Sequence, residues 1–154
     1  MFLSIKGAAQ HYVLENEIQI LFFETNTQKM LVIAKDTADA YLVCRYGTKD
    51  MIVFEFPETR IGSWEQFSYS WYLRGGGPEN EGLDLNYFYF INEGSKYVVY
   101  EEYSAVSGAI TYGIKIIDEG TGKTIDDMAI QSSVKGTLIG LREKEGITAG
   151  DELF

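Results

Sequence analysis

Apolar and polar residues alternate with a period of two over many short stretches of this chain, and this pattern constrains the fold more than any other feature. In an extended strand successive side chains point to opposite faces, so the alternation is typical of strands with one buried face. Polar or glycine-containing turns separate these stretches, for example at residues 25–28 and 92–95. We expect strands at residues 2–6, 10–15, 17–24, 29–35, 40–46, 51–56, 64–72, 83–91, 96–103 and 110–118, and we consider further strands at residues 123–128 and 136–142.

The connections between these stretches are short, so they predict antiparallel neighbours and an all-β, mainly antiparallel fold. A chain of 154 residues suits one domain. We therefore expect residues 1–154 to form a single β-sandwich or up-and-down barrel of about ten strands, with at most one or two short helices. Helical turns are considered at residues 36–40 and 124–133. The charged, glycine-bearing residues 143–154 are expected to form a frayed tail.

Charge and composition exclude several classes of function. The chain has 13 basic and 23 acidic residues and a net charge of −10, which argues against binding nucleic acid or an anionic membrane. One cysteine and one histidine are too few for a disulfide framework or a Cys/His zinc site. We expect no metal and no cofactor. The N-terminus lacks a signal-peptide pattern, and apolar runs are too short to span a bilayer, so we expect a cytoplasmic protein.

Three arrangements of residues bear on catalysis. Residues 120–124 read Gly-Thr-Gly-Lys-Thr, but a phosphate loop needs another glycine at position 117, where the chain has Ile117. His11 and Cys44 lie in strand-like stretches without a nucleophile elbow. Paired carboxylates beside aromatic residues would suit glycoside hydrolysis. The carboxylates considered for it are Glu55, Glu65, Glu101 and Glu102, with Trp64 or Trp71 stacking on the sugar.

Aromatic residues and acidic charge gather in the same part of the chain. Of the 22 aromatic residues, 12 lie between Trp64 and Tyr103. Residues 1–77 have 7 basic and 9 acidic groups, whereas residues 78–154 have 6 basic and 14 acidic groups. Both faces of the strands at 83–91 and 96–103 have large rings, so either both faces are covered or one is an exposed aromatic surface. We predict a partner-binding surface formed by Glu79, Glu81, Asp84, Tyr87, Tyr89, Glu101, Glu102, Tyr103 and Trp71.

An acidic surface with tyrosines suits a basic protein partner, because opposite potentials speed association and aromatic anchors supply affinity. In general character the chain is similar to the immunity proteins of bacterial toxin systems, which are small, acidic and cytosolic and cover the active sites of basic nuclease toxins. We therefore expect a non-enzymatic protein-binding module, in its most concrete form an immunity protein. A small-ligand or carbohydrate-binding barrel or sandwich is the alternative, and a two-carboxylate glycoside hydrolase is less favoured. The oligomeric state is left open.

Overall fold

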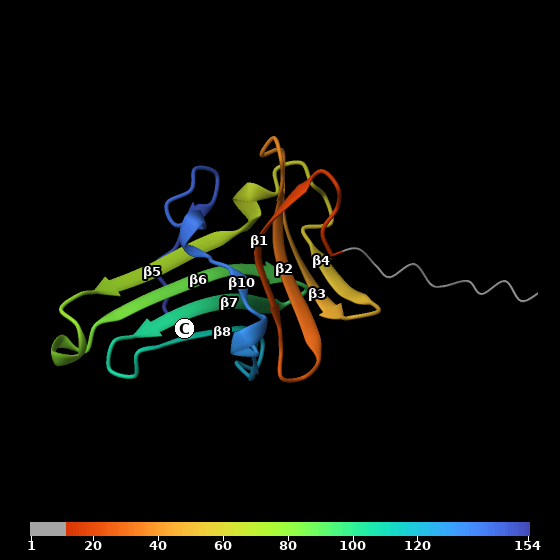
Figure 1. The fold of residues 1–154 in the computed structure, drawn as a ribbon. Helices are drawn as coiled ribbons and strands as arrows, with labels where there is room; N and C mark the ends of the chain where they lie inside the picture. Colours follow the sequence, from red (N-terminus) through yellow and green to blue (C-terminus); the bar gives the residue numbers. More distant parts are fainter. Residues whose placement is uncertain (1–11) are drawn as a thin grey trace, which may run out of the picture.

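The computed structural model describes residues 12–154, and β strands dominate within them. Two sheets pack face to face as a sandwich (Figure 1). The helical segments of these residues are single 3-10 turns, namely η1 (Trp64–Gln66), η2 (Pro78–Asn80), η3 (Gln131–Ser133) and η4 (Ile139–Leu141). The expected all-β, mainly antiparallel fold is confirmed, and the sandwich is the architecture observed.

Sheet one has the strand order β10-β1-β2-β3-β4, and every pair is antiparallel. Its strands are β1 (Glu17–Glu24), β2 (Lys29–Asp36), β3 (Leu42–Thr48), β4 (Ile52–Phe56) and β10 (Lys135–Gly136). A bulge between Gln19 and Leu21 shifts the register of β1 against β2. The bulge turns Leu21 into the core while Glu17 faces the other side of the sheet.

Sheet two has the order β11-β5-β6-β7-β8-β9, and only the β11–β5 pair is parallel. Its strands are β5 (Ser68–Arg74), β6 (Leu83–Asn92), β7 (Ser95–Ser104), β8 (Ala109–Asp118), β9 (Thr124–Met128) and β11 (Thr148–Ala149). Strands β6, β7 and β8 are ten residues each, longer than any strand of sheet one. One end of sheet two therefore projects beyond sheet one (Figure 1).

Several expected elements differ in the structure. Residues 12–16 contain no strand, the stretch 64–72 begins as the turn η1, and residues 124–133 are β9 followed by η3. The stretch 136–142 contains only the end of β10 and the turn η4. Trp64 belongs to η1, and its indole Nε1 donates a hydrogen bond of 2.9 Å to the carbonyl of Asp39 in the β2–β3 connection. The expected strand at residues 2–6 lies outside the described residues.

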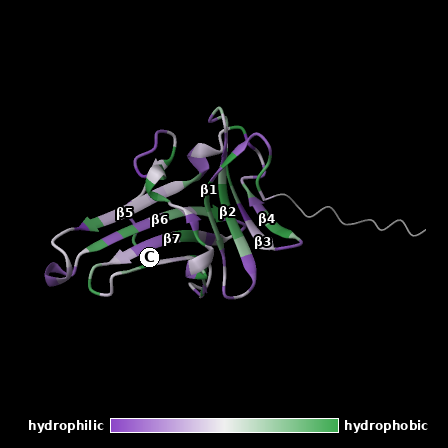
Figure 2. Cartoon of the chain, in the orientation of Figure 1, coloured by the Kyte–Doolittle hydropathy of each residue, from purple (hydrophilic) through white to green (hydrophobic). Residues whose placement is uncertain are grey.

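The core lies between the inner faces of the two sheets and is rich in stacked rings. Phe56 of β4 stacks on Phe90 of β6 at a centroid distance of 4.3 Å, and Phe67 stacks on Phe88 at 4.6 Å. Each such pair contributes about 0.5–1.5 kcal/mol beyond the area it buries. Figure 2 shows hydrophobic residues along β2 and along the part of β7 closest to sheet one.

The outer face of sheet one is covered by residues 12–16, and a buried ion pair lies beneath them. Arg45 donates hydrogen bonds to both carboxylate oxygens of Glu17, at 2.6 and 2.9 Å, and both side chains are sealed from solvent. Burial alone would raise the pKa of Glu17, but hydrogen bonds from Arg45, the Leu14 N–H and the Tyr41 hydroxyl, with the charge of Arg45, lower it below its ordinary value. This network ties residues 12–16 to sheet one.

The outer face of sheet two is covered by the end of the described chain, so residues 143–154 do not form the expected frayed tail. Thr148 and Ala149 pair with β5, and Phe154 packs against Tyr87 and Tyr89 on the outer face. These contacts bury apolar surface that the charged composition of this segment did not indicate.

Candidate functional site

The inner face of sheet two changes along its strands from buried and apolar to polar and then exposed, as the pairing of residues between neighbouring strands shows. Residues directly opposite one another on neighbouring strands share a face and form rows across the sheet. The row of Tyr69, Phe88, Val99 and Ile114 lies under sheet one and is buried. This row belongs to the core, and of the next two rows toward the projecting end only Tyr112 does.

The next row is polar and is covered by residues 137–142 rather than by sheet one. It consists of Trp71, Asn86, Glu101 and Tyr112. Glu101 is 4% exposed and accepts hydrogen bonds from the Tyr112 hydroxyl at 2.5 Å, the Thr137 hydroxyl at 2.7 Å and the Leu138 N–H at 3.2 Å. Its carboxylate therefore fastens the segment after β10 onto sheet two.

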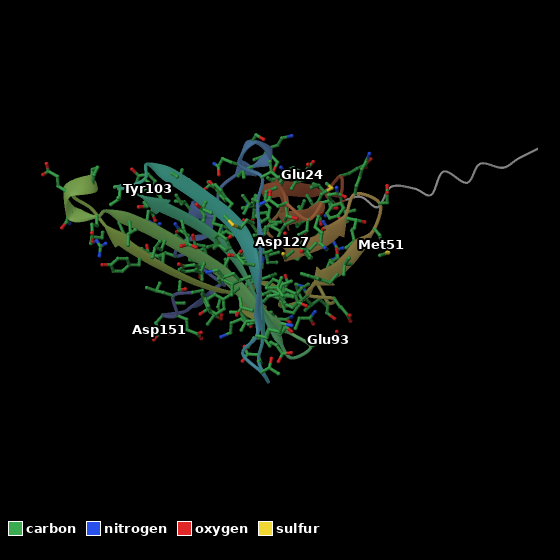
Figure 3. All side chains as sticks on the ribbon, turned by 90° about the horizontal axis from the view of Figure 1, so that it is seen from below. Glu24, Met51, Glu93, Tyr103, Asp127 and Asp151 are labelled. Atoms are coloured by element: carbon green, nitrogen blue, oxygen red, sulfur yellow. The ribbon has the colours of Figure 1, made fainter. Side chains whose placement is uncertain are left out.

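The last row lies at the projecting end and is open to solvent. It consists of Leu73, Asp84, Tyr103 and Ile110, one residue from each of β5, β6, β7 and β8. Leu73 is 57% exposed, Ile110 42% and Tyr103 38%, and Trp71 of the preceding row is 40% exposed. Figure 3 shows Tyr103 on this projecting part, far from Met51 at the β3–β4 connection. Apolar side chains gathered on one sheet face in this way are typical of an interaction surface.

Arg142 completes this surface. Its guanidinium lies 4.5 Å from the centre of the Trp71 ring, and its Nη2 donates to Asp84 at 2.6 Å and to the amide oxygen of Asn86 at 2.8 Å. Arg142 thereby neutralises Asp84 and holds one side of the indole. We call the surface formed by Trp71, Leu73, Asp84, Tyr103, Ile110 and Arg142 the distal face.

Five of the predicted partner-binding residues lie at this end of the molecule. Trp71, Asp84 and Tyr103 are part of the distal face itself. Glu79 and Glu81 are exposed in the β5–β6 connection, next to the end of the last row. The structure therefore brings together aromatic and acidic residues that the sequence associated only by proximity along the chain.

The other four predicted residues do not join them. Tyr87 and Tyr89 are buried on the outer face beneath Phe154, and Glu101 is buried on the inner face. Glu102 lies on the outer face beside Tyr87, where burial raises the pKa of its carboxyl group. The structure thus corrects the expectation of one shared patch, because both faces of sheet two are largely covered by other segments of the chain.

The structure places three of the four carboxylates considered for glycoside hydrolysis apart from one another, namely Glu55 on β4 and Glu101 and Glu102 on opposite faces of β7. Glu101 and Glu102 are successive residues of β7, so their side chains lie on opposite faces and do not flank a common sugar. Glu55 accepts a hydrogen bond of 2.6 Å from Nε of Arg45. Glu101 and Glu102 therefore do not provide the two facing carboxyl groups that the reaction requires.

Cys44 and residues 120–124, the other residues considered for catalysis or phosphate binding, have structural contacts in the described part of the chain. Cys44 is buried in the core, and burial raises the pKa of its thiol. Residues 120–123 lie in the β8–β9 turn and Thr124 begins β9; in this turn the carboxylate of Asp118 accepts the N–H groups of Gly120 and Thr121. Those amides are the groups that a phosphate would need. His11 lies outside the described residues.

Within residues 12–154 the structure has no group of three or more His, Cys, Asp and Glu residues that could hold a metal ion. In the same part of the chain, no helix has the length and apolar character needed to cross a membrane. No protein-family model, curated protein or solved structure matches the chain.

Sequence reasoning missed three members of the distal face. Leu73 and Ile110 could have been found from strand register, because hairpin pairing places them in a row with Asp84 and Tyr103. Arg142 gave no local signal. It reaches the face because η4 folds back over sheet two, and it follows Asp84 by 58 residues along the chain.

Proposed function

We propose that this chain is a non-catalytic protein-binding module whose distal face contacts a basic protein partner. The observation that carries the proposal is the open row across four strands, in which Leu73, Tyr103 and Ile110 stay exposed beside Trp71. Aromatic and aliphatic anchors at the centre of a surface provide most of the affinity in protein interfaces.

Charge favours a basic partner over an acidic one. Residues 78–154, which contain most of sheet two, have 14 acidic and 6 basic groups. Glu79 and Glu81 are exposed at the edge of the distal face, whereas Asp84 in its centre is already paired with Arg142. An apolar centre with an acidic rim gives a basic protein both affinity and a faster approach.

The most concrete form of the proposal is an immunity protein that covers the active site of a basic, nuclease-like toxin. The size, the acidic charge and the exposed aromatic face support this form. A toxin-like basic protein encoded next to this chain would be the partner to test first.

The test is differential capture with matched variants. The wild-type chain, the double variant Leu73→Asp/Tyr103→Asp and the control Ile61→Asp are immobilised and exposed to a lysate of the source cells. Ile61 is 88% exposed and lies outside sheet two, so its variant adds the same kind of charge away from the distal face. Circular dichroism and thermal unfolding confirm that all three chains are folded.

We expect one basic protein to bind the wild type and Ile61→Asp but not the double variant. With the purified partner, the double variant should weaken the Kd at least tenfold, and affinity should fall as salt rises from about 0.05 to 0.5 M. A partner bound equally by all three chains would refute the proposal, as would a salt-insensitive complex. Calorimetric binding of a sugar that depends on Trp71 would favour the carbohydrate-binding alternative instead.

A further inference from the structure

The outer face of sheet two has an aromatic surface whose occupant is a segment of the same chain. Tyr87, Tyr89, Val98 and Tyr100 form an apolar cluster on this face. The ring of Phe154 packs on Tyr89 at a centroid distance of 5.1 Å and on Tyr87 at 5.5 Å. We call residues 150–154 the tail segment.

The tail segment approaches this face along the edge of the sheet. The N–H of Thr148 donates to the carbonyl of Phe67 at 3.0 Å, and the N–H of Gly150 donates to that of Tyr69 at 2.9 Å. Asp151 lies next to β5 at this edge (Figure 3). Strand pairing ends here, so the residues that follow are held mainly by side chains.

The contacts beyond Gly150 define a recognition pattern. The hydroxyl of Ser70 donates to the carbonyl of Glu152, and the ammonium group of Lys96 binds the Glu152 carboxylate at 2.9 Å. Lys96 also lies 5.4 Å from the centre of the Phe154 ring. One lysine thus faces both an acidic side chain and an aromatic ring two residues further along.

Gly150 adds a steric condition. A Cβ atom at this position would lie 1.9 Å from the hydroxyl oxygen of Tyr89. Only glycine therefore passes this point without displacing the Tyr89 side chain. Together the contacts specify glycine, then an acidic residue two positions later, then an aromatic residue two positions after that.

The hold on the tail segment is suited to exchange. Glu152 is half exposed, with 51% of its side-chain surface open to solvent, and ion pairs at such sites are weak and screened by salt. Beyond β11 the segment is held by the Gly150 N–H bond to Tyr69, by the Ser70 hydroxyl and the Lys96 ion pair at Glu152, and by the packing of the Phe154 ring.

We propose that the outer face of sheet two is a peptide-binding face, and that a partner protein with an exposed Gly-x-acidic-x-aromatic segment displaces the tail segment from it. The partner segment would replace β11 as well as the tail segment: it would pair with β5 as β11 does, place its carboxylate on Lys96 and insert its ring against Tyr87 and Tyr89. This is strand addition at a sheet edge with side-chain pockets, a known mode of peptide recognition. It uses the opposite face from the proposed distal face and is independent of it.

The test uses the full chain with an emptied site. The variant Glu152→Gln/Phe154→Ala removes the two side chains that occupy the face, and the probe is a fluorescent peptide of residues 146–154 with both ends capped. We expect the peptide to bind the variant at least tenfold more tightly than the wild type, because only the wild type has a competing occupant. Adding Lys96→Glu to the variant should weaken binding about tenfold.

A control peptide with Gly150→Val keeps the acidic and aromatic residues, but its valine side chain would clash with the hydroxyl group of Tyr89. We expect it to bind at least tenfold less tightly than the parent peptide. Equal binding to wild type and variant, indifference to Gly150→Val, or no binding to a folded variant would overturn the proposal. If the variant does not fold, the wild type is titrated with millimolar peptide and followed by NMR. Unchanged chemical shifts of Ser70 and Lys96 would then overturn the proposal.

Ultracentrifugation distinguishes binding of a foreign partner from self-association of this chain. A concentration-dependent dimer of the wild type that is lost in Glu152→Gln/Phe154→Ala would mean that copies of this chain exchange their tail segments. That result would assign the face to self-association and would overturn a foreign partner. A monomer at all concentrations, with peptide binding to the variant, supports the proposal.

Discussion

Glu101 and Glu102 are neighbours in the sequence, yet the structure predicts opposite results for the same substitution. Glu101 is buried on the inner face and accepts hydrogen bonds from Tyr112, Thr137 and Leu138. Glu102 lies on the outer face, where burial raises the pKa of its carboxyl group and so disfavours its charged form. The pair Glu101→Gln and Glu102→Gln therefore provides a test with an internal control.

The cost of Glu101→Gln follows from its contacts. Gln has a single acceptor oxygen, so if that oxygen keeps Tyr112 and Thr137, the N–H of Leu138 faces an amide donor instead of Oε2. A buried donor without a partner costs about 1–3 kcal/mol, and each hydrogen bond to a charged group is worth about 1.5–3 kcal/mol. We expect a total loss of about 3 kcal/mol, which lowers the Tm by about 6–12 °C in a domain of this size.

Glu102→Gln should cost at most about 0.5 kcal/mol and can stabilise the fold, because it removes a partly buried charge. Urea unfolding at pH 7 measures both changes in the free energy of unfolding, with one m-value fitted to all chains. The reasoning is refuted if the two variants lose equal stability, or if Glu101→Gln stays within about 1 kcal/mol of the wild type. The burial of Glu101 also argues against the sequence prediction that this carboxylate contacts a partner.

Three further predictions concern the buried groups. Glu17→Gln should cost about 3 kcal/mol at pH 7, because Arg45 loses its fully buried countercharge and keeps only the partly exposed Glu55. Since the pKa of Glu17 is lowered in the fold, the stability that its charge adds is present above its ordinary pKa of 4.5 and lost at lower pH. The difference in free energy of unfolding between wild type and Glu17→Gln, measured in urea, should therefore become smaller in acid. Cys44 should resist a thiol reagent in the native chain and react fully in denaturant, and fast native labelling would contradict its burial. Gly113→Ala should lower the Tm by several degrees, because its Cβ would lie 2.3 Å from the hydroxyl of Tyr100, and an unchanged Tm would argue against that contact.

The class of the fold and most of its strands were determined by the sequence. Alternation along β1, β2, β6, β7 and β8 predicted those strands to within one or two residues, because burial of one sheet face imposes a period of two. Three members of the distal face, Trp71, Asp84 and Tyr103, were also selected from the sequence, since aromatic and acidic residues cluster in that part of the chain.

Only the tertiary structure decided which face of each strand is open. Alternation places Glu101 and Glu102 on opposite faces but does not say what covers either one. The distal face is open because sheet two is longer than sheet one, and the outer face is closed because the tail segment folds back onto Tyr87 and Tyr89. Coverage depends on contacts between segments far apart in the chain, and a period-two pattern contains only local information.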